Sequence, residues 1–206
     1  DEQYKDGFGP LTPGFVAIEY GSIEELKRAI NPNTVAFLVE PIQGESGVIV
    51  PPEGWLKASS EICRENKILW IADEIQSGLG RTGKLFACEH ENVRPDVVII
   101  GKALSGGMYP VSAVVASQEI LGVFKPGDHG STYGGNPLGS AIAREALKII
   151  IDEKLPQKSA ESGAYLMRKL KEIESQYIEQ IRGKGLWVGI VLKPSAGGTR
   201  RFCLAL

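Results

Sequence analysis

The sequence predicts an α/β fold with a mostly parallel β-sheet flanked by helices. Three observations support it: short apolar runs, helix-like segments between the early runs, and polar residues where three of the runs end. The run at residues 68–72 (ILWIA) suits a strand buried on both faces. Because a helix-like segment separates it from the run before, these two strands should be parallel, with a right-handed crossover.

The elements follow in order along the chain. The expected elements are strand 15–20, helix 22–30, strand 34–39, helix 56–66, strands 68–72, 97–100 and 111–116, helices 138–152 and 162–177, and strand 186–192. Ser22, with Glu25 three residues later, forms a capping box that opens the first helix. After Pro137 the apolar spacing becomes helical, and residues 182–186 (RGKGL) are expected to form a turn before the last strand.

The composition excludes several classes of protein. The 206 residues are 43% apolar and 23% charged, with a net charge of -2, as expected for a globular protein with a sizeable core. This charge predicts neither nucleic acid nor an anionic membrane as partner, and no apolar run is long enough to cross a bilayer. Three cysteines without a C-x-x-C pair predict a reducing compartment, the bacterial cytoplasm or, for a eukaryotic source, the mitochondrial matrix. The two histidines have no metal-ligand spacing.

A glycine-rich segment suggests a nucleotide-binding alternative. Residues 78–83 (GLGRTG) fit G-x-G-x-x-G, and residues 78–84 fit G-x-x-x-x-G-K. However, Leu85 stands where a P-loop carries a hydroxyl, and the loop follows an acidic pair that would repel phosphate. A turn-rich loop beside a ligand is the simpler interpretation.

Three expected strands end on polar residues: Glu40, Asp73 and Lys102. In a parallel sheet these ends meet at the edge where ligands bind. Asp73 and Lys102 could form a structural ion pair. Alternatively, a desolvated lysine can form a Schiff base with an aldehyde, and an aspartate can keep a pyridine nitrogen protonated. A protein that uses pyridoxal 5′-phosphate must supply both of these groups.

At these residues the sequence resembles a known family. The segment WIADEIQSGLGRTGKLFACEHENVRPDVVIIGKALSGGMYPVSAVV is similar to the signature of class III, fold-type I pyridoxal-phosphate aminotransferases. Within that class, VEPIQGESGV, SGGMYPVSAV, HGSTYGGNPLG and RGKGL look most like the ornithine aminotransferases. The resemblance implies a partial large domain at residues 1–150 and the start of a smaller α/β C-terminal domain at residues 151–206.

The resemblance also implies roles for individual residues. Lys102 matches the catalytic lysine that binds the cofactor aldehyde and later moves a proton. Asp73 matches the partner of the ring nitrogen, Ile75 the side chain against one ring face, and Gln76 the partner of the phenolic oxygen. Ser131 and Thr132 match residues that reach the cofactor phosphate of a neighbouring subunit, which implies a homodimer with a shared active site.

Glu45 corresponds to the substrate-site glutamate of the ornithine enzymes. There it pairs with an arginine and releases that arginine when an oxo-acid carboxylate binds, since one guanidinium fork cannot serve two carboxylates. A solvated loop carboxylate is the structural alternative. The implied reaction moves the δ-amino group of ornithine to 2-oxoglutarate by a ping-pong scheme; acetylornithine and 4-aminobutyrate are the alternative donors.

The chain also departs from the family. A full-length member is roughly twice as long, so the chain is expected to be truncated at both ends. The family's phosphate loop, stacking aromatic residue and switched arginine have no match here. We therefore expect weak cofactor binding and little turnover from these residues alone, or an inactive fragment that persists only as a folding or oligomerising unit.

Overall fold

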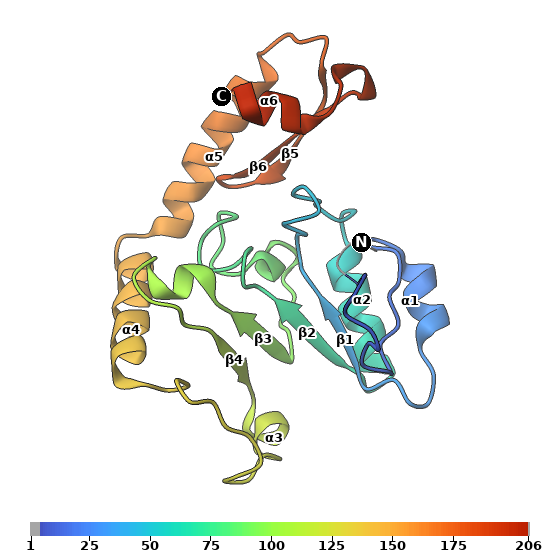
Figure 1. The fold of residues 1–206 in the computed structure, drawn as a ribbon, viewed down its shortest axis with the longest axis vertical. Coiled ribbons are helices and arrows are strands. Elements are labelled where there is room, and N and C mark those ends of the chain that lie inside the picture. Colours follow the sequence, from blue (N-terminus) through green and yellow to red (C-terminus); the bar gives the residue numbers. More distant parts are fainter. Residues whose placement is uncertain (1–4, 206) are drawn as a thin grey trace.

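Four strands form the main sheet of the computed structural model, which describes residues 5–205. The strands β1 (Ala36–Val39), β2 (Leu69–Asp73) and β3 (Val97–Ile100) are parallel, and β4 (Ala113–Ala116) runs antiparallel beside β3 (Figure 1). The register places Val39 beside Ala72. The mostly parallel sheet is therefore confirmed, and the carboxyl ends of β1, β2 and β3 share one edge.

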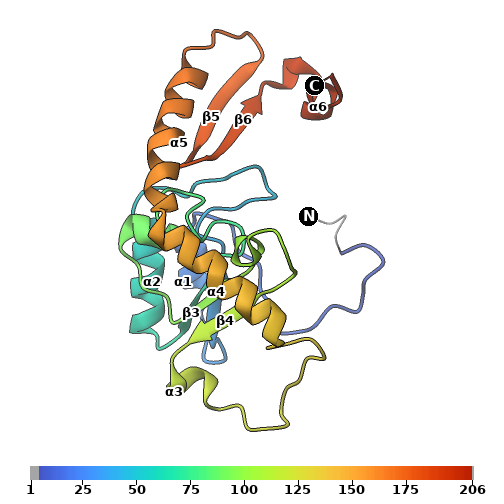
Figure 2. The same cartoon turned by 90° about the vertical axis from the view of Figure 1, so that its left-hand side faces the viewer.

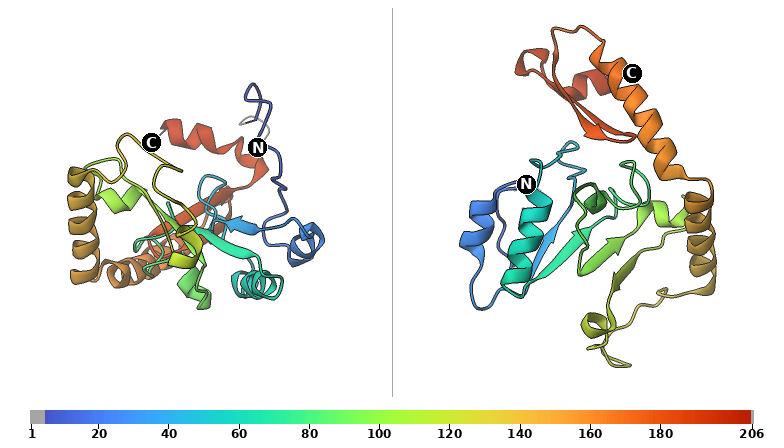
Figure 3. Two further views of the ribbon diagram at one scale, coloured as in Figure 1. Left: turned by 90° about the horizontal axis from the view of Figure 1, so that it is seen from below. Right: turned by 180° about the vertical axis from the view of Figure 1, so that it is seen from behind.

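Two helices pack beside the first two strands. The helix α1 (Ile23–Ala29) begins as expected, because Ser22 Oγ accepts a hydrogen bond from Glu25 N at 3.1 Å. The longer helix α2 (Trp55–Glu65) contacts β2 and lies beside α1 (Figure 3). Its apolar side chains and those of the strands form one buried cluster: Val39, Trp55, Leu56, Cys63, Ile68, Trp70, Ala72, Cys88 and Val93.

The first turn of α2 is capped from a distant part of the chain. Gly54, its N-cap residue, has no side chain to accept the free N–H groups. Glu91, at the end of the 3₁₀ helix η2 (Ala87–Glu91), accepts hydrogen bonds from Gly54 N and Lys57 N, both at 3.0 Å. Its negative charge also suits the positive end of the helix dipole.

A second cluster fixes the region after β3. The 3₁₀ helix η3 (Lys102–Ser105) packs against α4 (Pro137–Asp152), and a short helix α3 (Gln118–Leu121) follows β4. Leu79, Ile100, Leu104 and Ile150 are the buried members of this cluster. In this way α4 supports the turn that carries Lys102.

The C-terminal lobe, residues 155–205, stands beyond the carboxyl edge of the sheet (Figures 1 and 2). It contains α5 (Leu155–Lys171), the antiparallel hairpin of β5 (Ile178–Lys184) and β6 (Trp187–Leu192), η4 (Pro194–Ala196) and α6 (Thr199–Ala205). The division at residue 150 stays a prediction.

Several expected elements differ from the structure. Residues 15–20 form no strand, since they pair with no other strand. Glu19 N donates to Glu25 Oε2, and the Tyr20 hydroxyl donates to Glu40 O and Pro41 O. The helix expected at 162–177 begins instead at Leu155 and ends at Lys171. Of the turn expected at residues 182–186, residues 182–184 belong to β5, and residues 185–186 form the turn before β6. The strand β2 is buried on one face, through Trp70 and Ala72, and half-buried on the other.

Candidate active site

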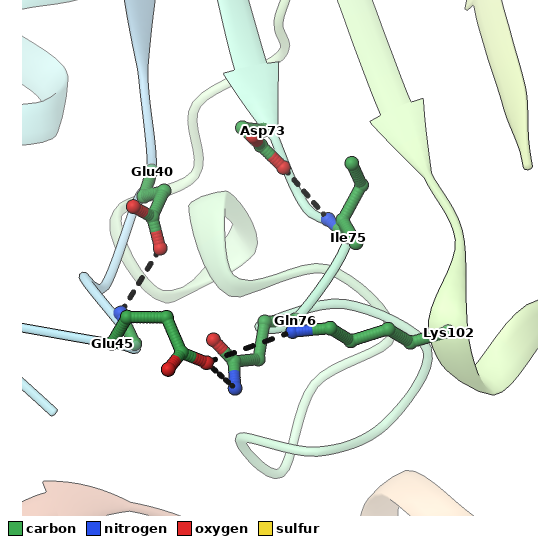
Figure 4. Close-up of polar contacts among 7 residues, drawn as sticks. Glu40, Glu45, Asp73, Ile75, Gln76 and Lys102 are labelled. Atoms are coloured by element: carbon green, nitrogen blue, oxygen red, sulfur yellow. Dashed lines mark hydrogen bonds and ion pairs between the residues drawn. The ribbon is translucent and has the colours of Figure 1, made fainter. Parts of the chain in front are cut away.

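The site is built at the carboxyl edge of the sheet. Glu40 follows β1, Asp73 ends β2, and Lys102 follows β3 after Gly101. Figure 4 shows that these side chains and two neighbouring loops converge on one region. Lys102 is the first residue of the tight turn η3. Its φ of 42° lies in the left-handed region, which residues other than glycine rarely adopt. Backbone strain of this kind is often found at functional sites.

Asp73 is half-buried and fixed by the chain that follows it. Its Oδ1 accepts a hydrogen bond from Ile75 N at 3.1 Å. Ile75 then lies against Gly101, where an added Cβ would be 3.4 Å from Ile75 Cγ2. The segment after β2 therefore packs directly on the residue that precedes Lys102.

Glu45, Gln76 and Lys102 form a polar group (Figure 4). Glu45 Oε1 accepts a hydrogen bond from Gln76 Nε2 at 3.2 Å and lies 4.0 Å from Lys102 Nζ. Both charged side chains are open to solvent, with 86% of Glu45 and 53% of Lys102 exposed. An ion pair with this exposure contributes little to stability.

Glu45 stands at the tip of a small hairpin, residues 43–49. Gln43 and Ile49 pair across it with hydrogen bonds of 3.0 and 2.9 Å, and Glu40 Oε2 accepts one from Gly44 N at 3.0 Å. Gly44 has no room for a side chain, because a Cβ there would collide with the amide of Gln76. Glu40 is thus a support of the hairpin.

Glu74 has a separate role that the sequence did not reveal. It is fully buried and accepts hydrogen bonds from Ser77 Oγ at 2.5 Å and Cys88 N at 2.9 Å. Burial raises its pKa, and these hydrogen bonds offset part of the rise. Strand alternation could have indicated this, because neighbours in a strand face opposite sides.

Ser131 and Thr132 lie on the exposed segment between α3 and α4. Ser131 Oγ accepts a hydrogen bond from Gly134 N at 3.1 Å. Within the described residues, neither side chain forms a hydrogen bond with Asp73, Gln76 or Lys102. Their role toward another subunit stays a prediction.

The glycine-rich loop binds the C-terminal lobe. Gly78, Gly80 and Gly83 donate their N–H groups to carbonyls within residues 74–85. The carbonyl of Arg81 accepts hydrogen bonds from Ser159 Oγ at 2.9 Å and from Leu186 N at 3.2 Å. The loop is therefore a docking element between two parts of the fold and does not offer those three N–H groups to a phosphate.

The donor set fits the cofactor that the resemblance implies. An exposed primary amine and a carboxylate stand at the ends of adjacent parallel strands, as an aldehyde and a protonated pyridine require. Ile75 and Gln76 add an apolar side chain and an amide donor from the same segment. Among residues 5–205, no cluster of three or more metal-binding side chains occurs, and no helix is long and apolar enough to cross a membrane.

Comparison with known proteins gives a consistent result. The family model described as aminotransferase class-III matches residues 1–206. An ornithine aminotransferase from a Geobacillus species is 57% identical, over 98% of this chain and 50% of its own length. A solved ornithine aminotransferase from Toxoplasma gondii, with partial occupancy of PLP at its active site, is 46% identical, with a TM-score of 0.93 over 95% of this chain and 47% of its own.

A solved acetylornithine aminotransferase from Elizabethkingia anophelis is 50% identical, with a TM-score of 0.89 over 97% of this chain and 52% of its own. The chain thus spans about half the length of the relatives it matches. The family match over the whole sequence, and these identities, show that the chain belongs to the class III aminotransferases.

Proposed function

We propose that this chain carries the catalytic centre of a pyridoxal-phosphate-dependent ornithine aminotransferase. The reaction would transfer the δ-amino group of ornithine to 2-oxoglutarate, giving glutamate 5-semialdehyde and glutamate in two ping-pong half-reactions. The placement of Asp73 and Lys102 at the ends of the paired strands β2 and β3 is the observation that carries the proposal.

Each residue would have a distinct task. Bound pyridoxal phosphate would supply an aldehyde and an electron-accepting ring. Lys102 would hold that aldehyde through its amine and then move a proton at the substrate carbon. Asp73 would keep the ring nitrogen protonated, Ile75 would pack on one ring face, and Gln76 would donate to the phenolic oxygen.

Glu45 would act on the substrate side. Its carboxylate oxygen Oε1 lies 4.0 Å from Lys102 Nζ. The carboxylate can therefore bind a cationic group that approaches this amine. We propose that it pairs with an arginine while the δ-amino group reacts, and releases that arginine for the carboxylate of the oxo acid.

Trapping of the cofactor on its lysine tests the proposal. Borohydride reduction after addition of pyridoxal phosphate should fix the label on the peptide that contains Lys102. Lys102→Ala should remove the label, and Lys84→Ala, a change at an exposed lysine outside the site, should keep it. A label on another lysine would overturn the assignment.

Acetylornithine is the second candidate donor, because the acetylornithine enzyme is as similar as the ornithine enzymes from solved structures. Turnover of ornithine, acetylornithine and 4-aminobutyrate should be compared in the longest native form of the protein. Faster turnover of ornithine than of the other two donors would support ornithine as the substrate. Glu45→Gln should then reduce turnover of ornithine more than turnover of acetylornithine. The opposite order would assign the acetylated donor.

For the 206 residues alone, we propose weak cofactor binding, because Lys102 is half-exposed and Asp73 is only half-buried. Absorbance titration with pyridoxal phosphate measures this, and a tight stoichiometric visible band would contradict it. We also propose a homodimer in which Ser131 and Thr132 serve the partner's site, and a cytoplasmic location, which the bacterial relatives favour.

A further inference from the structure

The hairpin that carries Glu45 has a strained backbone. At its descending side, Gly47 has a φ of 104° and Val48 a φ of 55°. A β-branched residue in the left-handed region is strained and persists only where its surroundings enforce it. Val48 is buried against Ile42 and Ala87, with Trp187 packed beside them. Part of the enforcement therefore comes from the C-terminal lobe.

Arg182 supplies a second constraint from the same lobe. Its guanidinium donates two hydrogen bonds to the carbonyl oxygen of Gly47, from Nε at 3.1 Å and from Nη2 at 2.9 Å. The two residues are 135 positions apart in sequence. Charged donors form stronger hydrogen bonds than neutral ones, and a planar fork also fixes direction.

The lobe also approaches the same turn closely with its backbone. At Gly189 in β6, an added Cβ would lie 3.0 Å from Gly47 O and 3.3 Å from Val48 Cβ. Trp187 extends the contact to Gly44, where an added Cβ would be 2.9 Å from Cζ2 of the indole. Hairpin 43–49 is thus held between the main sheet and the β5–β6 hairpin.

We propose that Arg182 is a positioning residue that, by gripping Gly47, holds the Glu45 carboxylate beside Gln76 and Lys102. The catalytic part of this proposal rests on the proposed function. The two hydrogen bonds from Arg182 to Gly47, called the grip below, do not depend on it. The grip makes the geometry at the amine depend on the seating of the C-terminal lobe. A loosened lobe would release the glutamate without any change in Lys102 or Asp73.

Hydrogen exchange of the protein without cofactor tests the grip. Arg182→Met should speed exchange of the amides of residues 47–49 about tenfold, because both charged hydrogen bonds to Gly47 O are lost. Arg182→Lys keeps the charge but loses the planar guanidinium. Exchange at residues 47–49 in this variant should therefore be faster than in the wild type and slower than in Arg182→Met. Arg64→Met, a matched change on the exposed side of α2, should leave these amides unchanged.

A double-mutant cycle tests whether Arg182 acts through Glu45. In the longest native form loaded with pyridoxal phosphate, Arg182→Met should lower kcat/KM for the amino donor by about 3- to 10-fold, and by less than about 2-fold when Glu45→Gln is already present. A purely structural role would give equal losses in both backgrounds.

The outcomes are separable. Unchanged exchange at residues 47–49, or faster exchange spread equally over α2 and β2, would overturn the grip. Local exchange as expected but with additive kinetic losses would overturn the positioning role. Absence of any cofactor label on Lys102 would refute the proposed function, while the exchange result would still decide whether Arg182 holds the hairpin.

Discussion

Asp73 and Glu74 are adjacent in sequence but serve opposite sides of the sheet. Asp73 stays half-exposed at the ligand edge, whereas Glu74 is enclosed by Ser77 and Cys88. The types and positions of Asp73 and Lys102 could be predicted because buried strands that end on such groups are unusual. Strand alternation could have indicated that Glu74 faces the buried side, but its contact with Cys88 and the contact of Arg182 with Gly47 could not be predicted, since each joins separate segments of the chain.

Glu74 should make stability depend on pH. Its pKa is raised in the folded state above the ordinary value of 4.5, chiefly by burial. The folded protein therefore retains a proton that the unfolded chain loses, and stability should fall as the pH rises from 4.5 through the folded-state pKa. The loss is about 1.4 kcal/mol for each tenfold change in the dissociation constant.

Urea unfolding of the wild type and Glu74→Gln across this range measures the effect. The variant should gain stability relative to the wild type as the pH rises, because its amide does not ionise. His90, whose pKa burial lowers, is the same in both proteins and cancels in the difference. A difference that does not vary with pH would rule out ionisation of Glu74 as the cause.

At the level of elements, a buried hydrogen bond joins α2 to β2. Trp70 Nε1 donates to Ser59 Oγ at 3.0 Å, and Ser59 Oγ donates in turn to Leu56 O at 2.9 Å. Ser59→Ala would leave the buried indole N–H without a partner and should cost about 1–3 kcal/mol. Thermal unfolding measures this loss.

Ser60→Ala, one position further along the same helix, is the control and should cost much less. Equal losses for the two variants would mean that the indole hydrogen bond contributes nothing to stability. Ser59→Ala should cost less in a Trp70→Phe background than in the wild type, since that background has no indole donor to leave unpaired.

Elements with local signals were predicted well, and those that depend on partners were not. The capping of α1 by Ser22 is a local signal, and α1 begins where it predicts. Residues 15–20 have β-forming side chains but no neighbouring strand to pair with. The start of α5 was missed because Lys154, left-handed with a φ of 53°, and Pro156 in the first turn allow a helix to begin there.

Across the whole molecule, close backbone packing holds the C-terminal lobe together. At Gly163 in the middle of α5, an added Cβ would lie 2.0 Å from the carbonyl oxygen of Gly185. Gly163→Ala should therefore destabilise the lobe by about 1–3 kcal/mol, although alanine is the better helix former.

Ser162→Ala, at the exposed neighbouring position, should be neutral or slightly stabilising. Limited proteolysis should show faster cleavage between α5 and β5 in Gly163→Ala only. A gain in melting temperature for Gly163→Ala would show that the helix can move away from Gly185 without cost.

The cap that Glu91 provides for α2 has a consequence for protein synthesis. Gly54 and Lys57 leave the ribosome before residue 91, so the first turn of this helix remains without its acceptor until that glutamate has emerged. A nascent chain arrested before residue 91 should therefore present a frayed helix start to chaperones. Release of the next few dozen residues would close that turn and seat the helix on its strands.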